Sequence, residues 1–187
     1  LKASDFEVPQ NRHRVIIIGI RDDVKGDFVF PAPIISPDLT VSTVINNSIL
    51  DDEKFEVWPL SPQAQLLSSY IPAGGSWKNI PDDVLPERLK RIRKEIKRYR
   101  SPNFYRKFNL DEIMGTITAA ATPENSGILH PLENRRYSVR EIARFQSFPD
   151  EFKFIGDSIP SKYKMIGNAV PPKLAYHIAK SVLEQVF

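Results

Sequence analysis

The chain contains 187 residues, of which 41% are hydrophobic and 26% charged, and its formal net charge is +3. These values are typical of a soluble globular protein, and no apolar stretch approaches the roughly 20 residues that span a bilayer. The chain has no cysteine and only three histidines, which lie far apart. Disulfides, thiolate zinc sites and a thiol nucleophile are therefore excluded for these residues, and no metal site is supported.

Near the N-terminus, three polar side chains precede an apolar run. Gln10, Arg12 and Arg14 alternate with other residues, and residues 15–20 follow as Val-Ile-Ile-Ile-Gly-Ile. The run predicts a strand buried on both faces. Successive side chains of an extended segment point to opposite faces, so the three polar residues share one face and His13 points away. Such a row suits binding an anionic or oxygen-rich group at the mouth of a buried strand.

The next region, residues 22–86, is polar and rich in proline, with a turn signal at Gly74-Gly75. This composition predicts only short regular elements, which we expect at residues 28–30, 41–46 and 55–58. Four large aromatic residues in and beyond this region are interpreted as core or hinge residues of a small domain: Trp58, Trp77, Phe104 and Tyr105.

A basic amphipathic helix is predicted over residues 85–99. Apolar residues recur there at helical spacing, at Leu85, Leu89, Ile92, Ile96 and Tyr99. The other face is basic and includes Lys90, Arg91, Lys94 and Arg98. Two interpretations stay open: a solvated helix face, or a surface that neutralises phosphates and releases their counterions.

Two further helices are predicted toward the C-terminus. Ser138 and Glu141 match a capping box, so a helix is expected over residues 139–147, in which Arg140 and Arg144 are interpreted as braces. The final helix should begin at Pro171-Pro172, because proline is favoured at the first helical position. Its apolar stripe is interpreted as packing surface and consists of Leu174, Ile178, Val182 and Val186.

Three blocks of this sequence together resemble the DNA cytosine-5 methyltransferases. They are residues 8–19, with Gln-x-Arg-x-Arg before the apolar run, residues 137–150, Tyr-Ser-Val-Arg-Glu-Ile-Ala-Arg-Phe-Gln-Ser-Phe-Pro-Asp, and residues 163–172, Tyr-Lys-Met-Ile-Gly-Asn-Ala-Val-Pro-Pro. The blocks are similar to the eighth, ninth and tenth motifs of that family and stand in its order. A long variable segment lies where the family keeps its target-recognition domain. One departure is Phe6-Glu7, where Tyr-Gly is more usual.

The resemblance implies a fold and a division of the chain. The expected fold class is an α/β remnant of the S-adenosylmethionine-dependent methyltransferase fold plus a small irregular α+β target-recognition domain. Residues 1–21 would end the catalytic domain, 22–136 would form the recognition domain, 137–159 a helix and hinge, and 160–187 the closing helix. The family's Pro-Cys nucleophile, Glu-Asn-Val acid and glycine-rich cofactor loop do not occur here, and the first residue is Leu1. We therefore expect the C-terminal part of a longer enzyme, inactive alone.

The resemblance also implies roles for the first block. In that family a cysteine thiolate attacks carbon 6 of a cytosine flipped out of duplex DNA, and carbon 5 then takes a methyl group from S-adenosylmethionine. Arg14 corresponds to the arginine at the cytosine oxygen, and Arg12 to the one that orders the catalytic region or the nearby DNA backbone. Gln10 would support the loop by hydrogen bonds. Without the resemblance, both arginines would be interpreted as surface charges at a strand edge.

Two further sites are implied. Gly167, Asn168, Ala169 and Val170 resemble the piece that closes the S-adenosylmethionine pocket, where Asn168 or main-chain N–H groups would bind the cofactor's carboxylate at a helix N-terminus. The alternative is a simple turn and helix cap. Thr116 and Thr118, in Gly-Thr-Ile-Thr, resemble the family's recognition element, which reads base edges. A short core strand is an equally good interpretation.

The expected partners are double-stranded DNA and the missing N-terminal catalytic half, with no metal and no membrane. The expected location is the bacterial cytoplasm, at the nucleoid, as in restriction-modification systems. Three alternatives stay open: a natural subunit of a split methyltransferase, a stand-alone DNA-binding module, and an enzyme of the same family that acts on transfer RNA. Base readout depends on loop geometry, so the target site does not follow from the sequence.

Overall fold

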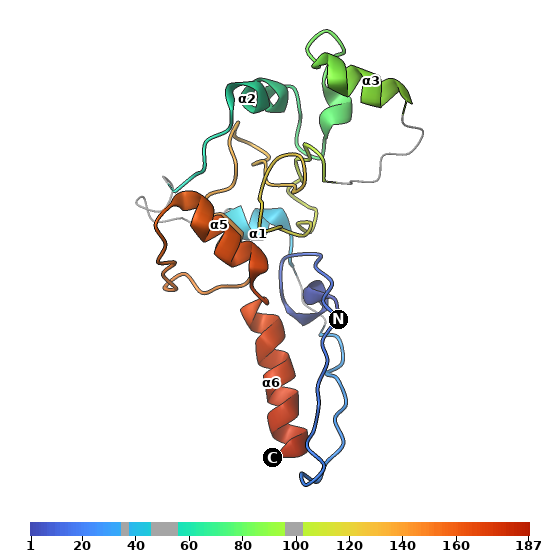
Figure 1. The fold of residues 1–187 in the computed structure, drawn as a ribbon, viewed down its shortest axis with the longest axis vertical. Helices are drawn as coiled ribbons and strands as arrows, with labels where there is room; N and C mark the ends of the chain where they lie inside the picture. The colour runs from blue at the N-terminus through green and yellow to red at the C-terminus, as the bar shows by residue number, and fades with distance from the viewer. Residues whose placement is uncertain (35–37, 46–55, 96–102) are drawn as a thin grey trace.

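The computed structural model describes residues 1–34, 38–45, 56–95 and 103–187 (Figure 1). In chain order, its elements are η1 (Ala3–Phe6), α1 (Val41–Ile45), α2 (Pro62–Ser69), η3 (Trp77–Asn79), α3 (Glu87–Glu95), α4 (Val139–Phe145), α5 (Ile159–Asn168) and α6 (Pro172–Val186). Six residues of the predicted elements lie outside the described residues: Asn46, Phe55, Ile96, Lys97, Arg98 and Tyr99.

Helices form where capping and proline signals predicted them. The Ser138 hydroxyl accepts the Glu141 N–H at 3.2 Å, and the Glu141 carboxylate accepts the Ser138 N–H at 2.5 Å, so the capping box of α4 is confirmed. Helix α6 begins at Pro172, as expected. Helix α3 lies within the predicted basic helix, and α1 confirms a short element at residues 41–45. Residues 28–30 and 56–58 form neither helix nor strand.

The predicted strand at residues 15–20 is not formed in the part of the chain that the structure describes. The backbone is extended, since exposed and half-buried residues alternate, but Val15 is 88% exposed and Ile17 90%. Pairing with the N-terminus ends at Arg14, whose N–H donates to the Leu1 carbonyl at 2.9 Å. A strand needs a neighbouring strand to bond its backbone groups. The element beside residues 18–20 is instead helix α6 (Figure 1).

The sheets of the expected fold class are likewise not formed within the described ranges, where pairing is limited to isolated bridges such as Gln10 to Met114. Sixteen prolines contribute to this outcome, because each lacks the N–H that a ladder requires. The described residues therefore consist of helices joined by long irregular segments.

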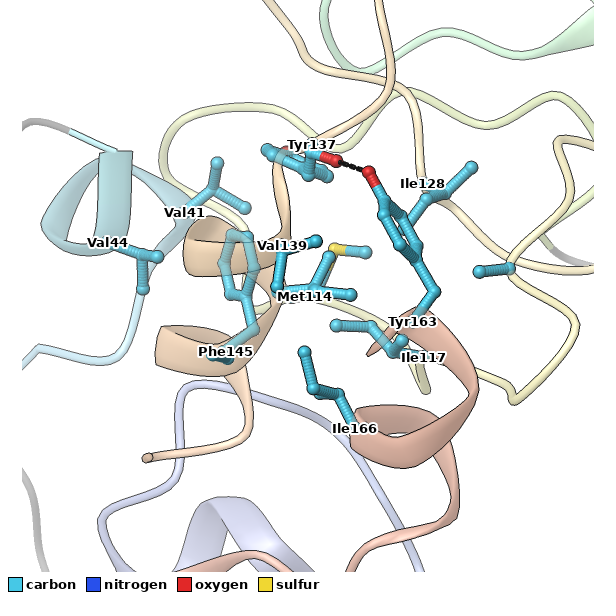
Figure 2. Packing of buried hydrophobic residues seen from close by; sticks show 13 residues of the cluster. Val41, Val44, Met114, Ile117, Ile128, Tyr137, Val139, Phe145, Tyr163 and Ile166 are labelled. Carbon is cyan, nitrogen blue, oxygen red and sulfur yellow. Dashed lines mark hydrogen bonds between the residues drawn. The ribbon is translucent and has the colours of Figure 1, made fainter. Parts of the chain in front are cut away.

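The largest core cluster joins segments from distant parts of the sequence (Figure 2). Met114 and Ile117 come from an extended segment, Tyr137 and Phe145 from the start and end of the α4 region, and Ile166 from α5. All five are at most 1% exposed. Residues of the expected recognition domain and of the C-terminal blocks thus share one core, which fixes the extended segment 114–119 against α5.

A second cluster lies beneath α2, η3 and α3. Trp77 and Tyr105 are each 4% exposed, which confirms their interpretation as core residues. Phe104 packs against them, with its ring 5.5 Å from that of Trp77. Arg93 covers the Trp77 ring at 5.2 Å, so one arginine of α3 serves packing.

Two buried tyrosines offer a matched test of the core. The Tyr163 hydroxyl donates to the Tyr137 carbonyl (Figure 2) and accepts the Trp58 N–H at 3.3 Å. The Tyr137 hydroxyl has no partner among the described residues. Burial raises the pKa of both phenols. Because an unmade hydrogen bond costs more than a missing group, Tyr163→Phe should destabilise the fold by about 1–2 kcal/mol and Tyr137→Phe should not destabilise it. Urea unfolding of both variants measures this, and equal losses would contradict it.

Candidate functional site

The three polar residues of the first block lie on one face, as predicted, but at different depths. Gln10 and Arg12 are 0% exposed, whereas Arg14 is half-buried and His13 exposed. The row therefore runs from the core toward the surface. Arg14 alone of the three offers its side chain to a molecule from outside.

The Arg12 guanidinium is bound by three backbone carbonyls. One Nη donates to the Ile117 carbonyl at 2.7 Å, and the other donates to the carbonyls of Gly167 at 2.6 Å and Ala169 at 3.2 Å. A planar fork of donors suits this task, since it reaches acceptors on two segments at once. Arg12 thus joins the segment 114–119 to residues 167–170, which comprise the end of α5 and the turn after it.

Two buried glutamines extend this junction. Gln10 accepts the Ile117 N–H at 3.1 Å and donates to the side-chain oxygen of Gln146 at 3.1 Å. Gln146 is 0% exposed and donates to the Ile166 carbonyl at 2.7 Å and to the Ala169 carbonyl at 3.4 Å. Sequence reasoning missed Gln146, although a glutamine among the apolar residues that end α4 is a usable signal.

Arg14 has a different environment. One Nη donates to the His13 carbonyl at 2.7 Å, and partial burial lowers the pKa of the guanidinium from its ordinary value. Arginine nevertheless stays protonated at neutral pH. A cation with some of its water removed gains more from an acceptor than a fully solvated one does, so Arg14 is suited to hold an oxygen of a ligand.

The structure places the predicted cofactor residues at the C-terminal end of α5. Gly167 and Asn168 are the last residues of that helix, and the N–H of Ala169 bonds back to the Met165 and Ile166 carbonyls. The expected anion site at a helix N-terminus is therefore wrong for these residues, because α6 begins only at Pro172. Asn168 and Val170 point their side chains to the surface and are the groups free to meet a ligand.

Gly167 is required by close packing. A Cβ at this position would lie 2.6 Å from both the Ala119 nitrogen and its Cα, and 2.6 Å from the Thr118 carbonyl carbon. No side chain fits such a gap, so the backbone of α5 touches the backbone of the segment 114–119. Glycine is thus needed at position 167 because it lets two backbone segments of the protein touch, and not because a cofactor must approach closely.

The two predicted recognition threonines lie on that same segment and are half-buried. Thr116 donates to the Asn11 carbonyl at 2.9 Å, and the Thr118 hydroxyl lies 3.0 Å from that of Ser126 and donates to the Asn125 side chain at 3.2 Å. Ile117 between them is 0% exposed. Core residues Met114 and Ile117 are separated by two half-buried residues. Within the described segment 114–119 only Met114 forms a backbone bridge, so the predicted short core strand is not formed.

Helix α3 carries its predicted basic face. Arg91 and Lys94 are exposed, while Lys90 is half-buried and forms an ion pair with Glu87 at 2.6 Å. No residue of this helix is fully buried, but Leu89 and Ile92 are half-buried and pack against the second cluster. The free cations of α3 thus lie on the surface that faces away from the core.

Glu7, which stands where the family pattern has glycine, adopts a backbone conformation that favours glycine. Its φ of 59° lies in the left-handed region, which costs a residue with a side chain about 1–2 kcal/mol and suits glycine. The Glu7 carboxylate lies 3.0 Å from Nε2 of His177 and 4.0 Å from Nζ of Lys173, both on α6. These contacts offset part of the strain and tie the loop before Gln10 to α6.

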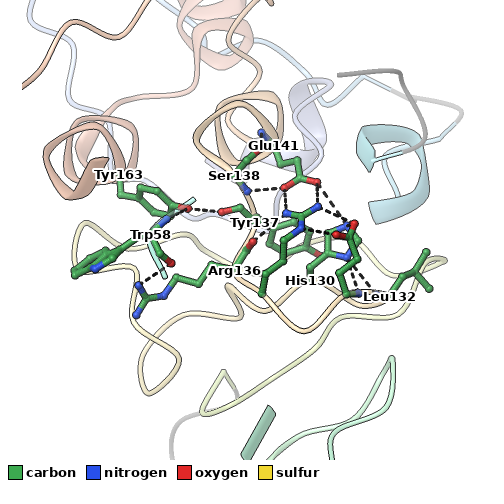
Figure 3. A network of polar contacts seen from close by, with 10 residues as sticks. Trp58, His130, Leu132, Arg136, Tyr137, Ser138, Glu141 and Tyr163 are labelled. Atoms are coloured by element: carbon green, nitrogen blue, oxygen red, sulfur yellow. Dashed lines mark hydrogen bonds and ion pairs between the residues drawn. The ribbon is translucent and has the colours of Figure 1, made fainter. Parts of the chain in front are cut away.

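A buried polar network joins the end of the irregular region to α4 (Figure 3). Arg135 binds the Glu141 carboxylate with two donors, at 2.7 and 3.0 Å, and Glu141 also accepts the Ser138 N–H. Nε2 of His130 lies 3.5 Å from Glu141. Sequence reasoning found only the capping role of Glu141. Arg136 stacks on the Trp58 ring at 4.4 Å and donates to the carbonyl of that residue.

His130 gives this network a pH dependence. It is 3% exposed, and its Nδ1 accepts the N–H groups of Leu132 at 3.3 Å and Glu133 at 3.1 Å, which requires the neutral ring. Burial lowers the pKa of His130, against the opposing effect of Glu141. The unfolded chain therefore binds a proton near pH 6.5 that the folded chain does not, so unfolding free energy falls as the pH falls below 6.5.

We expect a slope from this residue of at most about 1.4 kcal/mol per pH unit. Urea unfolding between pH 7.5 and 5 measures it. In the His130→Gln variant this part of the slope should be absent. A slope identical to that of the wild type would show that His130 is not its source.

Two negative findings concern the described ranges. No group of three or more histidine, cysteine, aspartate or glutamate side chains there is arranged to hold a metal ion. Among the same residues, none of the helices combines the length and the apolar character that crossing a membrane requires.

The two arginines of α4 that were predicted to brace the structure do so. Arg140 donates to the Pro149 and Phe152 carbonyls, and Arg144 pairs with Asp150 at 2.7 Å.

Comparison with known proteins matches residues 1–184 to the model of a family described as C-5 cytosine-specific DNA methylase. Type II methyltransferase M.NgoFVII of Neisseria gonorrhoeae is 34% identical over 96% of this chain and 47% of its own length. Type II methyltransferase M.Sau96I of Staphylococcus aureus is 32% identical over 98% of this chain and 42% of its own length. DNA (cytosine-5)-methyltransferase CMT3 of Arabidopsis thaliana is 50% identical over 46 residues, which are 25% of this chain and 6% of that protein.

The class of protein is therefore that of the DNA methylases. Within that class the chain belongs to the C-5 cytosine-specific DNA methylase family, as the three blocks indicated. It spans less than half the length of the two bacterial relatives.

Proposed function

We propose that this chain is the C-terminal portion of a DNA cytosine-5 methyltransferase and supplies target recognition and one wall of the active site. The observation that carries the proposal is the row from Gln10 to Arg14, buried at one end and open at the other, in a chain of this family. No cysteine occurs in the chain, so the nucleophile must come from elsewhere. The complete enzyme, as used below, means these residues together with their cysteine-bearing part.

Arg14 is assigned the oxygen of the extruded cytosine. Attack of a thiolate on carbon 6 pushes electron density onto the ring and its carbonyl oxygen. A fixed guanidinium at that oxygen stabilises the charge as it develops, in a site from which water is largely excluded. The buried positions of Gln10 and Arg12 assign them to supporting the Arg14 backbone and its surroundings, without contact to the base.

S-adenosylmethionine would supply the methyl group as an electrophile. Among residues 167–170, at the end of α5 and just after it, the exposed side chains are those of Asn168 and Val170. The amide of Asn168 fits a hydrogen bond to its carboxylate, and Val170, 45% exposed, fits an apolar wall. The carbonyls of Gly167 and Ala169 are occupied by Arg12 and hold the turn in place.

The exposed side of residues 15–19 supports completion by another part of the enzyme. Val15 and Ile17 are almost fully exposed on an extended segment whose backbone pairing ends at Arg14. Apolar side chains and open backbone groups together suit addition to a sheet. In the complete enzyme this segment would form the α/β strand that the sequence predicts.

Recognition of duplex DNA is assigned to Thr116, Thr118 and the basic face of α3. Each cation that neutralises a phosphate adds about 0.9 to the slope of log affinity against log salt. Replacing both Arg91 and Lys94 with alanine should therefore reduce that slope by about 2. Fluorescence anisotropy at several salt concentrations measures it, and Lys180→Ala on α6 is the control. An unchanged slope in the α3 variant would assign its cations to solvation alone.

The product of the reaction tests the proposed function. Duplex DNA is incubated with the complete enzyme and S-adenosylmethionine, digested, and its nucleosides are separated by mass spectrometry. The proposal expects 5-methyldeoxycytidine, formed only when both parts are present. Methylation of another base, or of transfer RNA in preference to DNA, would contradict it.

A further inference from the structure

The segment that carries the recognition threonines is held from below by the first block. Gln10 accepts the N–H of Ile117, and Arg12 donates to the carbonyl of the same residue, at 3.1 and 2.7 Å. Both backbone groups of Ile117 are thus bound by side chains that are 0% exposed. Thr116 and Thr118 flank this residue, so their positions depend directly on Gln10 and Arg12.

The same side chains bind the turn after α5. Arg12 donates to the Gly167 and Ala169 carbonyls, and Gln146 donates to those of Ile166 and Ala169. Gln10 and Gln146 are linked at 3.1 Å. The missing Cβ of Gly167 lets the two backbones touch at Ala119. The segment 114–119 and the turn 167–170 therefore share one buried junction, in which their backbones are in direct contact with no side chain between them.

From these contacts we infer that Arg12 is a positioning residue for target recognition, which holds Thr116 and Thr118 in register with the turn 167–170, where the cofactor is proposed to bind. The inference rests on the proposed function and adds to it a residue that contacts neither DNA nor cofactor. Displacement of one segment displaces the other, because each is bonded to the same guanidinium. Discrimination between target sites and affinity for the cofactor should then change together, as two linked binding events do.

Arg12→Lys in the complete enzyme tests this. Lysine keeps the charge but has a single ammonium in place of the fork, so it cannot reach carbonyls on both segments with the same geometry. Once the target site is mapped by bisulfite sequencing, two quantities are measured. They are the ratio of methylation rates on the target duplex and on one with a single base pair changed, and the Kd of S-adenosylhomocysteine by calorimetry. We expect the ratio to fall, and the Kd to rise, by about tenfold each, about 1.4 kcal/mol.

The control is Arg140→Lys. Arg140 is also buried, at 7% exposure, and also donates to two backbone carbonyls, at 3.2 and 2.9 Å, but it binds the loop after α4. Loss of folded protein lowers both methylation rates alike and leaves their ratio unchanged. Arg140→Lys should therefore leave both quantities as they are.

Gln146→Met is the second variant and serves if Arg12→Lys does not fold. It has nearly the same size and removes only the amide, so the same two changes are expected at smaller size. Normal discrimination and normal Kd in both variants would overturn the inference while leaving the proposed function standing. Absence of cytosine methylation by the wild-type enzyme would instead remove the proposed function itself.

Discussion

Replacing Arg14 with alanine in the complete enzyme should lower the rate of methyl transfer by about 100- to 1,000-fold, the usual effect of removing one donor from a site of developing negative charge. The guanidinium is half-buried, and within the described ranges it donates to the carbonyl of the neighbouring His13, so exchanging this bond for one to a ligand costs little. Affinity for the duplex should change little, because the lost contact forms only at the extruded base. Single-turnover kinetics and DNA anisotropy measure the two effects.

His13→Ala is the matched control for that variant. His13 is the preceding residue, its side chain is exposed, and it lies on the opposite face of the extended segment. Its loss should leave the rate within about twofold, the scale of ordinary surface substitutions. If Arg14→Ala retained the wild-type rate, or if both variants lost it equally, Arg14 would have no role at the base.

Removal of the Glu141 side chain should be the most destabilising of the substitutions considered. Glu141 is 1% exposed, accepts two hydrogen bonds from Arg135 and closes the capping box of α4. Glu141→Ala leaves the buried part of Arg135 without this partner and the Ser138 N–H without its acceptor. A loss of about 2–3 kcal/mol in unfolding free energy is expected, because the cap is lost and the buried Ser138 N–H is left without an acceptor, while Arg135 keeps Glu133.

Glu133→Ala provides the comparison. Glu133 binds the same guanidinium at 2.9 Å, but its side chain is 58% exposed. An exposed partner contributes at most about 1 kcal/mol, so this variant should unfold close to the wild type. Both are measured by urea unfolding at pH 7.5. Similar losses in the two variants would show that burial does not set the value of this ion pair.

Local signals predicted local structure well. The capping box at Ser138 and the proline at position 172 fix the beginnings of α4 and α6 through contacts within a few residues. Ser61 followed by Pro62 is the same kind of signal for the start of α2, although no helix was predicted there. Such elements depend on neighbours in the chain, so a sequence read without its fold can reveal them.

The burial of individual side chains and their contact partners far along the chain could not be predicted from such local signals. Alternation placed Gln10, Arg12 and Arg14 on one face, yet it carries no information on which of them lies in the core. The partner of Gln10 is 136 positions away, at Gln146, and only the assembled fold brings them together. For residues 15–20 the apolar pattern predicted burial, but the described chain leaves Val15 and Ile17 exposed. A strand is a property of two segments, and one sequence segment cannot specify its neighbour.

The contact between Arg14 and the cytosine oxygen can be measured directly by changing both sides of it. Wild-type enzyme and the Arg14→Ala variant are each given target duplexes with cytosine or 2-thiocytosine at the methylated position, where sulfur replaces the oxygen and accepts hydrogen bonds weakly. If the guanidinium holds that oxygen, the thio substitution slows the wild type strongly and the variant hardly at all. Equal slowing of both enzymes would show that the two groups do not meet.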